Sequence, residues 1–342
     1  MKALITGISG QDGSYLCELL LSKGYEVYGL DRRKGIESFP RIDKKVLERL
    51  HIVEGDLLDF ERLRQIVKEV MPDEIYNLAA QSHVGYSFKA PISTFEMSGK
   101  AVLFFLEIIR EVNSASADVP KIKFYQASTS ELFGGDPGTE PQSETTPFNP
   151  HSPYAIAKLS GFHFVKLYRE AYKIFACNGI LFNHESPRRG ADFVTRKVTL
   201  ALANIKAGRQ EFLELGNMDA KRDWGFAGDY VEGMWRILQN DTPDDFVLAT
   251  GETHTVREFV EEAGKLLGYD VVWEGKAEKE IGKDKKTGKI IVKINPEFYR
   301  PGEVNLLLGD PAKAKKVLGW TAKTSFKELV KMMVEADVES IK

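Results

Sequence analysis

Long apolar runs are missing from this chain of 342 residues. No stretch has the roughly 18 consecutive apolar residues that a membrane-spanning helix requires, and the first residues lack the apolar core of a secretory signal peptide. Neither sign of charge prevails, because 47 Lys and Arg residues face 50 Asp and Glu residues, and no strong field would attract nucleic acid or an anionic membrane. We therefore expect a cytoplasmic protein without nucleic-acid or membrane partners.

Cysteine and histidine are also scarce. The two cysteines, Cys17 and Cys177, each lie in an apolar segment, where a reduced, buried thiol is the usual outcome. The six histidines have no Cys or His neighbours at the spacing of metal ligands. We therefore predict neither a redox role for the cysteines nor a metal site.

Short apolar runs alternate with helix-period segments through the first half of the chain, which is typical of βαβ units. The predicted strands are Lys2–Thr6, Glu26–Leu30, Leu50–Glu54, Glu74–Leu78, Lys123–Ala127, Ala176–Phe182 and Phe246–Ala249. The predicted helices lie near Gly13–Lys23, Asp59–Val70, Pro91–Val112 and Ser152–Tyr172. This pattern predicts an α/β fold with a Rossmann-type, doubly wound parallel sheet.

The pattern changes at Asn183. Helical stretches at Phe193–Ala207 and Val256–Leu267 are separated by turn-rich, charged segments, which predicts a smaller mixed α/β lobe. The charged run Lys276–Lys289 indicates a solvated hairpin or a flexible loop. We assign residues 1–182 and about 228–252 to the Rossmann-type domain, and residues 183–227 and 253–342 to the second lobe.

The segment T-G-I-S-G-Q-D-G follows the first predicted strand and opens the first helix. Its glycines, Gly7, Gly10 and Gly13, permit a tight turn and a close approach of the backbone to a pyrophosphate, which a helix N-terminus also favours. A purely structural glycine turn is the weaker interpretation, because the loop stands between a strand and a helix. We predict that the first domain binds a nicotinamide dinucleotide.

The end of the second strand carries conflicting signals about the cofactor. Asp31 stands where an acidic residue commonly bonds the adenosine ribose of NAD. Arg32 and Arg33, which follow it, could instead pair the 2′-phosphate of NADP. Both cofactors stay open on these residues alone.

Tyr154 and Lys158 are four residues apart on one face of a predicted helix. A free phenol with a pKa near ~10 is a poor base, but a nearby ammonium and an oxidised nicotinamide ring both favour the phenolate. Such a pair often occurs by chance, and the glycine loop is what favours a catalytic interpretation. Thr129 and Glu131 follow the strand Lys123–Ala127 and could present a hydroxyl and a carboxylate at the same edge of the sheet, although a helix N-cap is the alternative.

Several longer blocks accompany these residues. They include P-D-E-I-Y-N-L-A-A-Q-S-H-V from Pro72, A-S-T-S-E-L-F-G from Ala127, S-P-Y-A-I-A-K from Ser152, C-N-G-I-L-F-N-H-E-S-P-R-R-G from Cys177, G-N-M-D-A-K-R-D-W-G from Gly216 and R-P-G-E-V-N-L-L-L-G-D-P-A-K-A from Arg300. Together with the loop, they resemble the extended short-chain dehydrogenase/reductase superfamily and, within it, the GDP-mannose 4,6-dehydratases. The resemblance runs nearly end to end.

This resemblance implies a hydro-lyase that oxidises C4 of GDP-D-mannose, loses water across C5 and C6, and returns the hydride to C6. The product would be GDP-4-dehydro-6-deoxy-D-mannose, and a tightly bound NADP would end as it began. Tyr154 would take the proton of the C4 hydroxyl, and Glu131 would remove the C5 proton and protonate the departing C6 hydroxyl. Thr129 would orient the sugar.

The resemblance also implies binding residues. Contacts with NADP fall on Gly7, Ile8, Ser9, Gly10, Gln11, Asp12, Gly13, Arg32, Arg33, Lys34, Gly35, Asp56, Leu57, Leu78, Ala79, Ala80, Gln81, Ser82, Lys158, His184 and Arg189. Contacts with the GDP-sugar, in the second lobe, fall on Asn183, Val194, Lys197, Arg222, Arg300 and Glu303. The family assembles as dimers or tetramers, so we expect a homodimer or homotetramer. Three features depart from the family pattern: Ser93, where a tyrosine is usual, Asp31, where a neutral or basic residue is usual, and the stretch Gly35–Phe39, where a serine-rich stretch is usual.

Two other functions share parts of this pattern. A nucleotide-sugar 4-epimerase or 4-reductase would need the same fold, loop and Tyr–Lys pair, but no carboxylate to take a C5 proton. A non-catalytic regulator that senses the dinucleotide would be expected to lose the tyrosine or the lysine, and this chain keeps both Tyr154 and Lys158.

Overall fold

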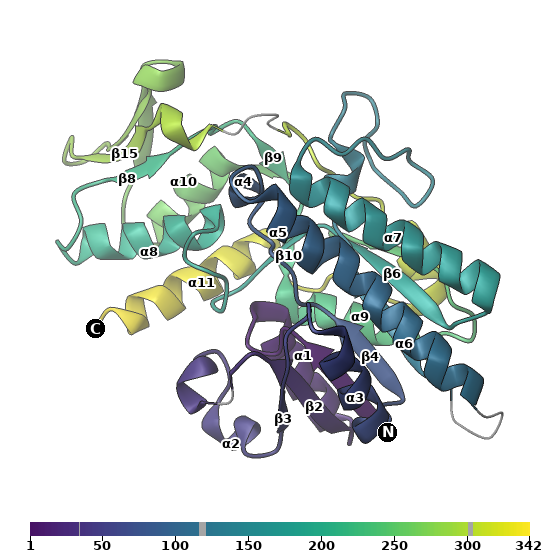
Figure 1. The fold of residues 1–342 in the computed structure, drawn as a ribbon. Coiled ribbons are helices and arrows are strands. Elements are labelled where there is room, and N and C mark those ends of the chain that lie inside the picture. Colours follow the sequence, from purple (N-terminus) through teal and green to yellow (C-terminus); the bar gives the residue numbers. More distant parts are fainter. Residues whose placement is uncertain (34, 116–120, 300–303) are drawn as a thin grey trace.

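The computed structural model describes residues 1–33, 35–115, 121–299 and 304–342 (Figure 1). Lys34, Arg300 and Glu303, three of the predicted binding residues, therefore lie outside the described residues. A seven-stranded sheet has the order β11-β6-β5-β4-β1-β2-β3, and every neighbouring pair is parallel. The strand order reverses beside β1, as in a doubly wound Rossmann sheet.

All seven predicted strands are confirmed, each to within one residue at either end. They are β1 (Lys2–Thr6), β2 (Glu26–Asp31), β3 (His51–Glu54), β4 (Glu74–Asn77), β5 (Lys123–Ala127), β6 (Ala176–Leu181) and β11 (Phe246–Leu248). Apolar side chains on both faces of a parallel sheet are buried, which is why these strands appear as short apolar runs in the sequence.

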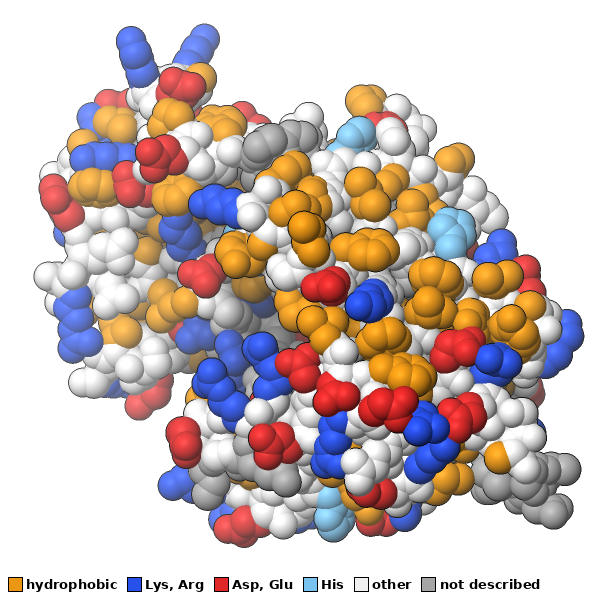
Figure 2. Space-filling view, viewed as in Figure 1, with side chains coloured by type: hydrophobic (Ala, Val, Ile, Leu, Met, Phe, Trp, Pro, Cys, Tyr) orange, Lys and Arg blue, Asp and Glu red, His pale blue; other side chains and the backbone are white. Residues whose placement is uncertain are grey.

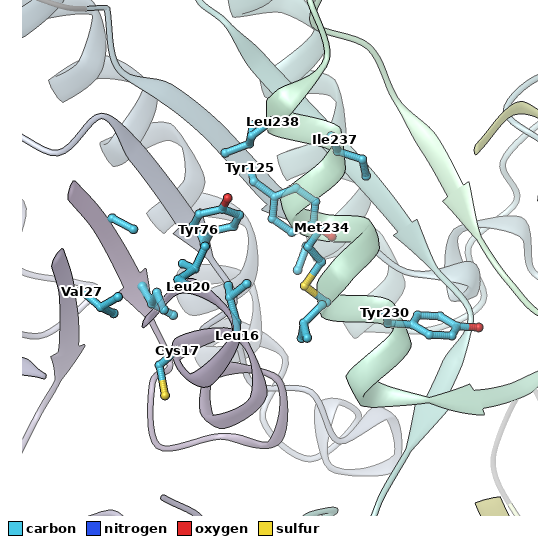
Figure 3. Close-up of a cluster of buried hydrophobic side chains, with 14 of the residues drawn as sticks. Leu16, Cys17, Leu20, Val27, Tyr76, Tyr125, Tyr230, Met234, Ile237 and Leu238 are labelled. Atoms are coloured by element: carbon cyan, nitrogen blue, oxygen red, sulfur yellow. The ribbon is translucent and has the colours of Figure 1, made fainter. Parts of the chain in front are cut away.

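Helices cover both faces of this sheet. On one face lie α1 (Gln11–Ser22) and α9 (Ala227–Gln239), and Figure 3 shows Leu16 and Leu20 of α1 and Met234 of α9 gathered with Tyr76 and Tyr125 of the sheet. The other face is covered by α3 (Phe60–Val70), α6 (Ala101–Ala115) and α7 (Pro153–Tyr172). The short helices α2 (Lys44–Leu47), α4 (Val84–Ser87) and α5 (Pro91–Phe95) lie in the connections. Both cysteines are buried free thiols, as predicted.

The predicted continuous helix Pro91–Val112 was wrong in one respect. A π-helical turn, Glu96–Lys100, separates α5 from α6. At this turn α7 crosses so closely that a Cβ at Gly99 would lie 2.6 Å from Ser160 Oγ and 3.0 Å from the Ala157 carbonyl oxygen. The wide turn therefore coincides with a tertiary contact that the local sequence pattern does not contain.

The second lobe packs three helices, α8 (Val194–Lys206), α10 (Val256–Leu266) and α11 (Phe326–Ser340), around a core of their own. Its small sheet has the order β13-β14-β15-β8, with β8 (Leu213–Leu215), β13 (Val271–Glu274), β14 (Ile281–Asp284) and β15 (Ile290–Ile294). The run Lys276–Lys289 forms β14 and the turn into β15, so the hairpin interpretation is confirmed. Four short strands complete the lobe: β7 (Asn183–Glu185), β9 (Lys221–Arg222), β10 (Trp224–Phe226) and β12 (His254–Thr255).

The division of the chain into two domains stays a prediction. The assignment of residues 228–252 to the Rossmann-type domain is supported by two elements. Helix α9, which begins one residue earlier, covers the seven-stranded sheet, and β11 is an edge strand of that sheet. Among the described residues, no helix is both long and apolar enough to cross a membrane. The cytoplasmic location stays a prediction from the sequence.

Candidate active site

A cleft of about 1600 Å³ opens at the carboxyl ends of the parallel strands and extends to α8 and β9. Figure 2 shows the molecule hollowed between its two lobes, with Lys and Arg side chains gathered beside the hollow. Ligands of open α/β sheets bind at this edge, where the strand order reverses. The cleft is therefore the candidate active site.

The glycine loop forms one wall of the cleft. Gly7 has a φ of 70°, and a Cβ there would come within 3.0 Å of the Ala79 backbone. A Cβ at Gly13 would lie 2.3 Å from the Gly7 carbonyl oxygen, so neither position accepts a side chain. Among the described residues no side chain caps α1, whose N-cap is Gly10, and the N–H groups of its first turn are therefore available to an anion.

The hydroxyl of Thr6 joins this loop to the end of β4. It accepts hydrogen bonds from the backbone N–H groups of Leu78 (3.1 Å) and Ala79 (3.0 Å), and it donates to Asn77 Oδ1 (2.7 Å). The predicted stretch after β4 is thereby held against the glycine loop. Leu78, Ala79, Ala80 and Ser82 line the cleft there.

Asp31 lines the cleft at the end of β2. Its Oδ2 accepts a hydrogen bond from Ser9 Oγ at 2.6 Å, and its Oδ1 accepts one from the Arg33 backbone N–H at 3.1 Å. Both oxygens of the carboxylate are thus engaged by the protein. The side chains of Arg32 and Arg33 are exposed on the same wall.

Asp12 and His184 form an ion pair at the floor of the cleft. His184 Nε2 lies 2.9 Å from Asp12 Oδ2, and Nδ1 lies 2.8 Å from the Phe182 carbonyl oxygen, so both ring nitrogens face acceptors, an arrangement that suits the doubly protonated ring. Burial lowers the pKa of His184, but Asp12 outweighs it and the net pKa is raised. Burial likewise raises the pKa of Asp12, but His184 outweighs it and the net pKa falls to about 2.

We expect this pair to stabilise the fold most between about pH 4 and pH 6.5. Because the pKa of His184 is raised, its contribution is complete below its unfolded-state value and is lost as the pH rises through the folded value. Because the pKa of Asp12 is lowered, its contribution is lost only as the pH falls from 3.8 toward about 2, a shift worth on the order of 2 kcal/mol.

Urea unfolding of the wild type and of His184→Gln measures this effect. The difference in unfolding free energy between the two should be larger at about pH 5.5 than at about pH 8.5. An equal difference at both values would contradict the assignment of a charged His184.

Tyr154 and Lys158 lie on α7, whose start is fixed by the Ser152 side chain, which caps it, and by Pro153. Both side chains are buried at the cleft, and Lys158 Nζ donates to the Ala127 carbonyl oxygen at 2.9 Å. Burial lowers the pKa of Lys158 to about 8, so its ammonium loses its proton as the pH rises through about 8. Burial raises the pKa of Tyr154 to about 12, although a hydrogen bond with Thr129 acts in the opposite direction.

Thr129 and Glu131 come to the same place from β5. Thr129 caps a 3₁₀ turn, Ser130–Phe133, and its Oγ1 accepts from the Glu131 backbone N–H at 3.3 Å, so the N-cap alternative is also realised. Glu131 is 9% exposed and its charge raises the pKa of Tyr154. The structure thus brings Thr129, Glu131, Tyr154 and Lys158 to one end of the cleft.

The second lobe supplies the opposite wall. Asn183, Val194, Lys197 and Arg222 all line it. Burial lowers the pKa of Lys197, whose Nζ lies 3.6 Å from the centroid of the Phe298 ring. Among the described residues no side chain caps α8, which begins at Val194, so the N–H groups of its first turn are available to a ligand beside Lys197.

Few of the predicted binding residues that the structure describes lie outside the cleft. Ile8 is fully buried against Gly29, and Gly35 and Gln81 do not line the cleft, whereas the other described cofactor residues do. Several residues that line the cleft were missed. Among them are Arg41, which donates to the Ser9 carbonyl oxygen at 3.3 Å, and the pair Phe298 and Tyr299. The aromatic pair directly precedes the R-P-G-E block, a signal that the sequence did offer.

A nicotinamide dinucleotide fits the first wall of this cleft. The glycine positions of the loop admit no side chains, and the first turn of α1 offers N–H groups to a pyrophosphate. Within the described part of the chain, Gln81 Oε1 and Ser128 Oγ are buried without hydrogen-bond partners, so polar groups near the cleft are left for a ligand to satisfy.

Comparison with known proteins decides the family. The model of the family described as GDP-mannose 4,6 dehydratase matches residues 4–333. The chain belongs to the GDP-mannose 4,6-dehydratase family. A family member from Dictyostelium discoideum is 54% identical, with 99% of this chain and 96% of that protein covered, and one from Homo sapiens is 52% identical, with 98% and 91% covered.

Among solved structures, the UDP-glucose 4-epimerase of Thermus thermophilus, in complex with NAD, has the same fold. Its TM-score is 0.80 at 25% identity, and the match covers 98% of this chain and 99% of that one. The 4,6-dehydratase family and this epimerase therefore share one architecture, and their chemistry must differ through individual side chains.

Proposed function

We propose that this protein dehydrates GDP-D-mannose to GDP-4-dehydro-6-deoxy-D-mannose with a tightly bound nicotinamide dinucleotide. One observation carries the proposal: a buried carboxylate, Glu131, stands beside the Tyr154 phenol in a cleft that accepts a dinucleotide on one wall. The membership of the 4,6-dehydratase family supports the same substrate and reaction. When bound, the dinucleotide would take the hydride from C4 of the sugar and return it to C6.

The side chains would divide the proton transfers. As a phenolate, Tyr154 would accept the proton of the C4 hydroxyl, and the Lys158 ammonium, 5.9 Å from the centroid of its ring, would favour that charged form. Thr129 would donate or accept a hydrogen bond at the same oxygen. Once C4 is a ketone, the proton on C5 becomes acidic, and the Glu131 carboxylate removes it. The resulting Glu131 carboxylic acid then protonates the departing C6 hydroxyl, so that water leaves, a double bond joins C5 and C6, and the carboxylate is restored. When the hydride returns to C6, C5 takes a proton from solvent, and Tyr154 releases to solvent the proton that it accepted.

The opposite wall would hold the GDP part of the substrate. Lys197 and Arg222 provide cations for the diphosphate, and the first turn of α8 provides N–H groups. Asn183 is half-buried, its Oδ1 has no hydrogen-bond partner among the described residues, and it would provide a further polar contact. Together these groups fix the sugar with its C4–C6 edge toward Glu131.

Glu131 also separates this function from its nearest alternative. A 4-epimerase or 4-reductase moves a hydride at C4 without breaking the C5–H bond. Incubation with GDP-mannose in deuterated water, without added reductant, should therefore give a 6-deoxy-4-keto product that carries deuterium at C5. An unlabelled 4-epimer as product would overturn the proposed function. The absence of any product from a protein with bound dinucleotide would instead favour a non-catalytic regulator that senses the dinucleotide.

We infer that the dinucleotide is NADP, with NAD accepted more weakly. Arg32 and Arg33 are exposed on the cleft wall, where they can pair a 2′-phosphate. Asp31 opposes this by charge, but its two carboxylate oxygens are already engaged by Ser9 Oγ and the Arg33 backbone N–H rather than left for a ribose hydroxyl. Both features are local to the adenosine end of the cleft.

Asp31→Asn should therefore separate the two cofactors. Removal of the charge should tighten NADPH binding by about tenfold, a ~1.4 kcal/mol effect, because one unit of repulsion at the 2′-phosphate disappears. NADH should bind more weakly or equally, since the amide is a poorer acceptor for a ribose hydroxyl. Titration of cofactor-free protein, followed by nicotinamide fluorescence, measures the dissociation constants for NADPH and NADH. A change of the same size and direction in both constants would contradict this role of Asp31.

We further infer a homodimer. Large apolar side chains are exposed over α4, α5 and α7, among them Tyr86, Ile92, Phe95, Ile156 and Leu167, and α5 and α6 pack directly against α7. An exposed apolar helical face of this kind suits a second copy of the chain related by a two-fold axis. Sedimentation velocity should give a dimer or a tetramer built from such dimers, and a monomer at micromolar concentration would contradict the inference.

A further inference from the structure

Glu185 is a buried carboxylate that none of the proton transfers above requires. It ends β7, is 2% exposed, and pairs in register with Phe226 of β10. Its Oε2 accepts a hydrogen bond from Thr195 Oγ1 at 2.5 Å and lies 3.1 Å from Arg189 Nε. The Nε–H does not point along that line, so the second contact is an ion pair rather than a hydrogen bond.

The first partner, Arg189, belongs to the cofactor wall of the cleft. Its guanidinium lies 3.7 Å from the centroid of the Phe193 ring, which it covers as a cation over an aromatic face. Its charge acts on Asp12 and Tyr154, where it favours the ionised form of each. The position of this cation therefore matters at the centre of the site.

The second partner, Thr195, belongs to the substrate wall. It is the second residue of α8, a helix for which the described residues provide no side-chain cap. Glu185 thus ties the first turn of α8 to β7. Val194 and Lys197, one residue before and two after Thr195, line the cleft.

We propose that Glu185 is a positioning residue that fixes both walls of the cleft through a single carboxylate oxygen. It holds the Arg189 cation against the cofactor side and the first turn of α8 against the nucleotide-sugar side. The proposal rests on the proposed function for the identity of the two ligands. It predicts that the binding of two chemically unrelated ligands depends on one residue through its contacts with Arg189 and Thr195.

The chain contains a matched control for this residue. Asp337 is also a fully buried carboxylate that pairs with an arginine and a threonine of α8: Oδ1 accepts from Arg196 Nε at 2.6 Å, and Oδ2 accepts from Thr199 Oγ1 at 2.6 Å. These partners lie one residue after Thr195 and one turn further along the helix. Unlike Glu185, Asp337 does not line the cleft in the described part of the chain.

The test compares Glu185→Gln with Asp337→Asn. Cofactor-free protein is titrated with NADPH by fluorescence and with GDP by calorimetry, and the thermal midpoint of each variant is recorded. Glu185→Gln should weaken the binding of both NADPH and GDP by about tenfold or more, because a buried charge pair loses one partner. Asp337→Asn should lower the thermal midpoint as well but leave both dissociation constants within about twofold, since its contacts lie outside the site.

Double variants assign the effect to the two contacts. In an Arg189→Gln background, Glu185→Gln should cause no further loss of NADPH binding. In a Thr195→Val background, it should cause no further loss of GDP binding. Dissociation constants for Glu185→Gln that match the wild type, equal losses in Asp337→Asn, or fully multiplicative double variants would each overturn the proposal. A wild-type protein that binds neither NADPH nor GDP would overturn the proposed function and this inference together, whereas the former outcomes leave the function intact.

Discussion

Glutamine in place of Glu131 is expected to lower the turnover of GDP-mannose by about a thousandfold or more, since a general acid–base group contributes roughly 10² to 10⁴ in rate and this one acts in two successive transfers. The amide keeps the shape of the buried side chain but cannot take the C5 proton. Oxidation at C4 does not use Glu131, so the variant should still convert bound dinucleotide to its reduced form when GDP-mannose is added.

The readout is therefore a pair of measurements. Absorbance of the reduced nicotinamide should rise and persist in Glu131→Gln, and deuterium should not enter C5 of the recovered sugar. Turnover within a few-fold of the wild type would show that another group removes the C5 proton. The dissociation constant for GDP should not change, because the proposed function assigns GDP to Lys197 and Arg222 and not to Glu131.

Phenylalanine in place of Tyr154 is expected to lower turnover by a similar factor, about a thousandfold, but at an earlier step. The ring that packs beside Lys158 is retained, while the oxygen that takes the C4 proton is lost. No reduced nicotinamide should form when GDP-mannose is added, in contrast to Glu131→Gln. Reduction at the wild-type rate would assign the base to Lys158 or Thr129 instead.

The same residue gives a dependence on pH. Burial holds the pKa of Tyr154 at about 12 and that of Lys158 at about 8 in the structure. The Lys158 ammonium is present below about pH 8 and is lost above it, so the electrostatic support for the phenolate weakens as the pH rises. C4 oxidation in single-turnover experiments should therefore cease to increase above this pH.

Local patterns explain which parts of the molecule the sequence could predict. The strands follow from short apolar runs, the loop from three glycines at fixed spacing, and the Tyr154–Lys158 pair from one helical turn. Each of these signals is complete within about ten residues. The π-helical turn at Glu96–Lys100 was not predictable in this way, because its cause is the crossing of α7 at Gly99.

Two of the longer helices, α9 and α11, were missed for different reasons. In α9, Gly228 and Gly233 lower the intrinsic helix propensity, yet Gly233 is required by packing, since a Cβ there would lie 2.6 Å from a methyl of Leu248. In α11, the capping box of Ser325 and Glu328 was a legible signal that went unused. The first omission has a tertiary cause and the second does not.

The contacts around the glycine loop bear on how the protein folds. Asp12 meets His184 across 172 residues of chain, and Gln11 meets the His184 carbonyl oxygen and Ser186 Oγ across 173 and 175 residues. Closing so long a segment is entropically costly and slow compared with forming the adjacent βαβ units. A nascent chain that ends before residue 184 would carry the whole glycine loop without the histidine that pairs with Asp12, so the start of α1 can gain these contacts only after His184 and Ser186 have been added.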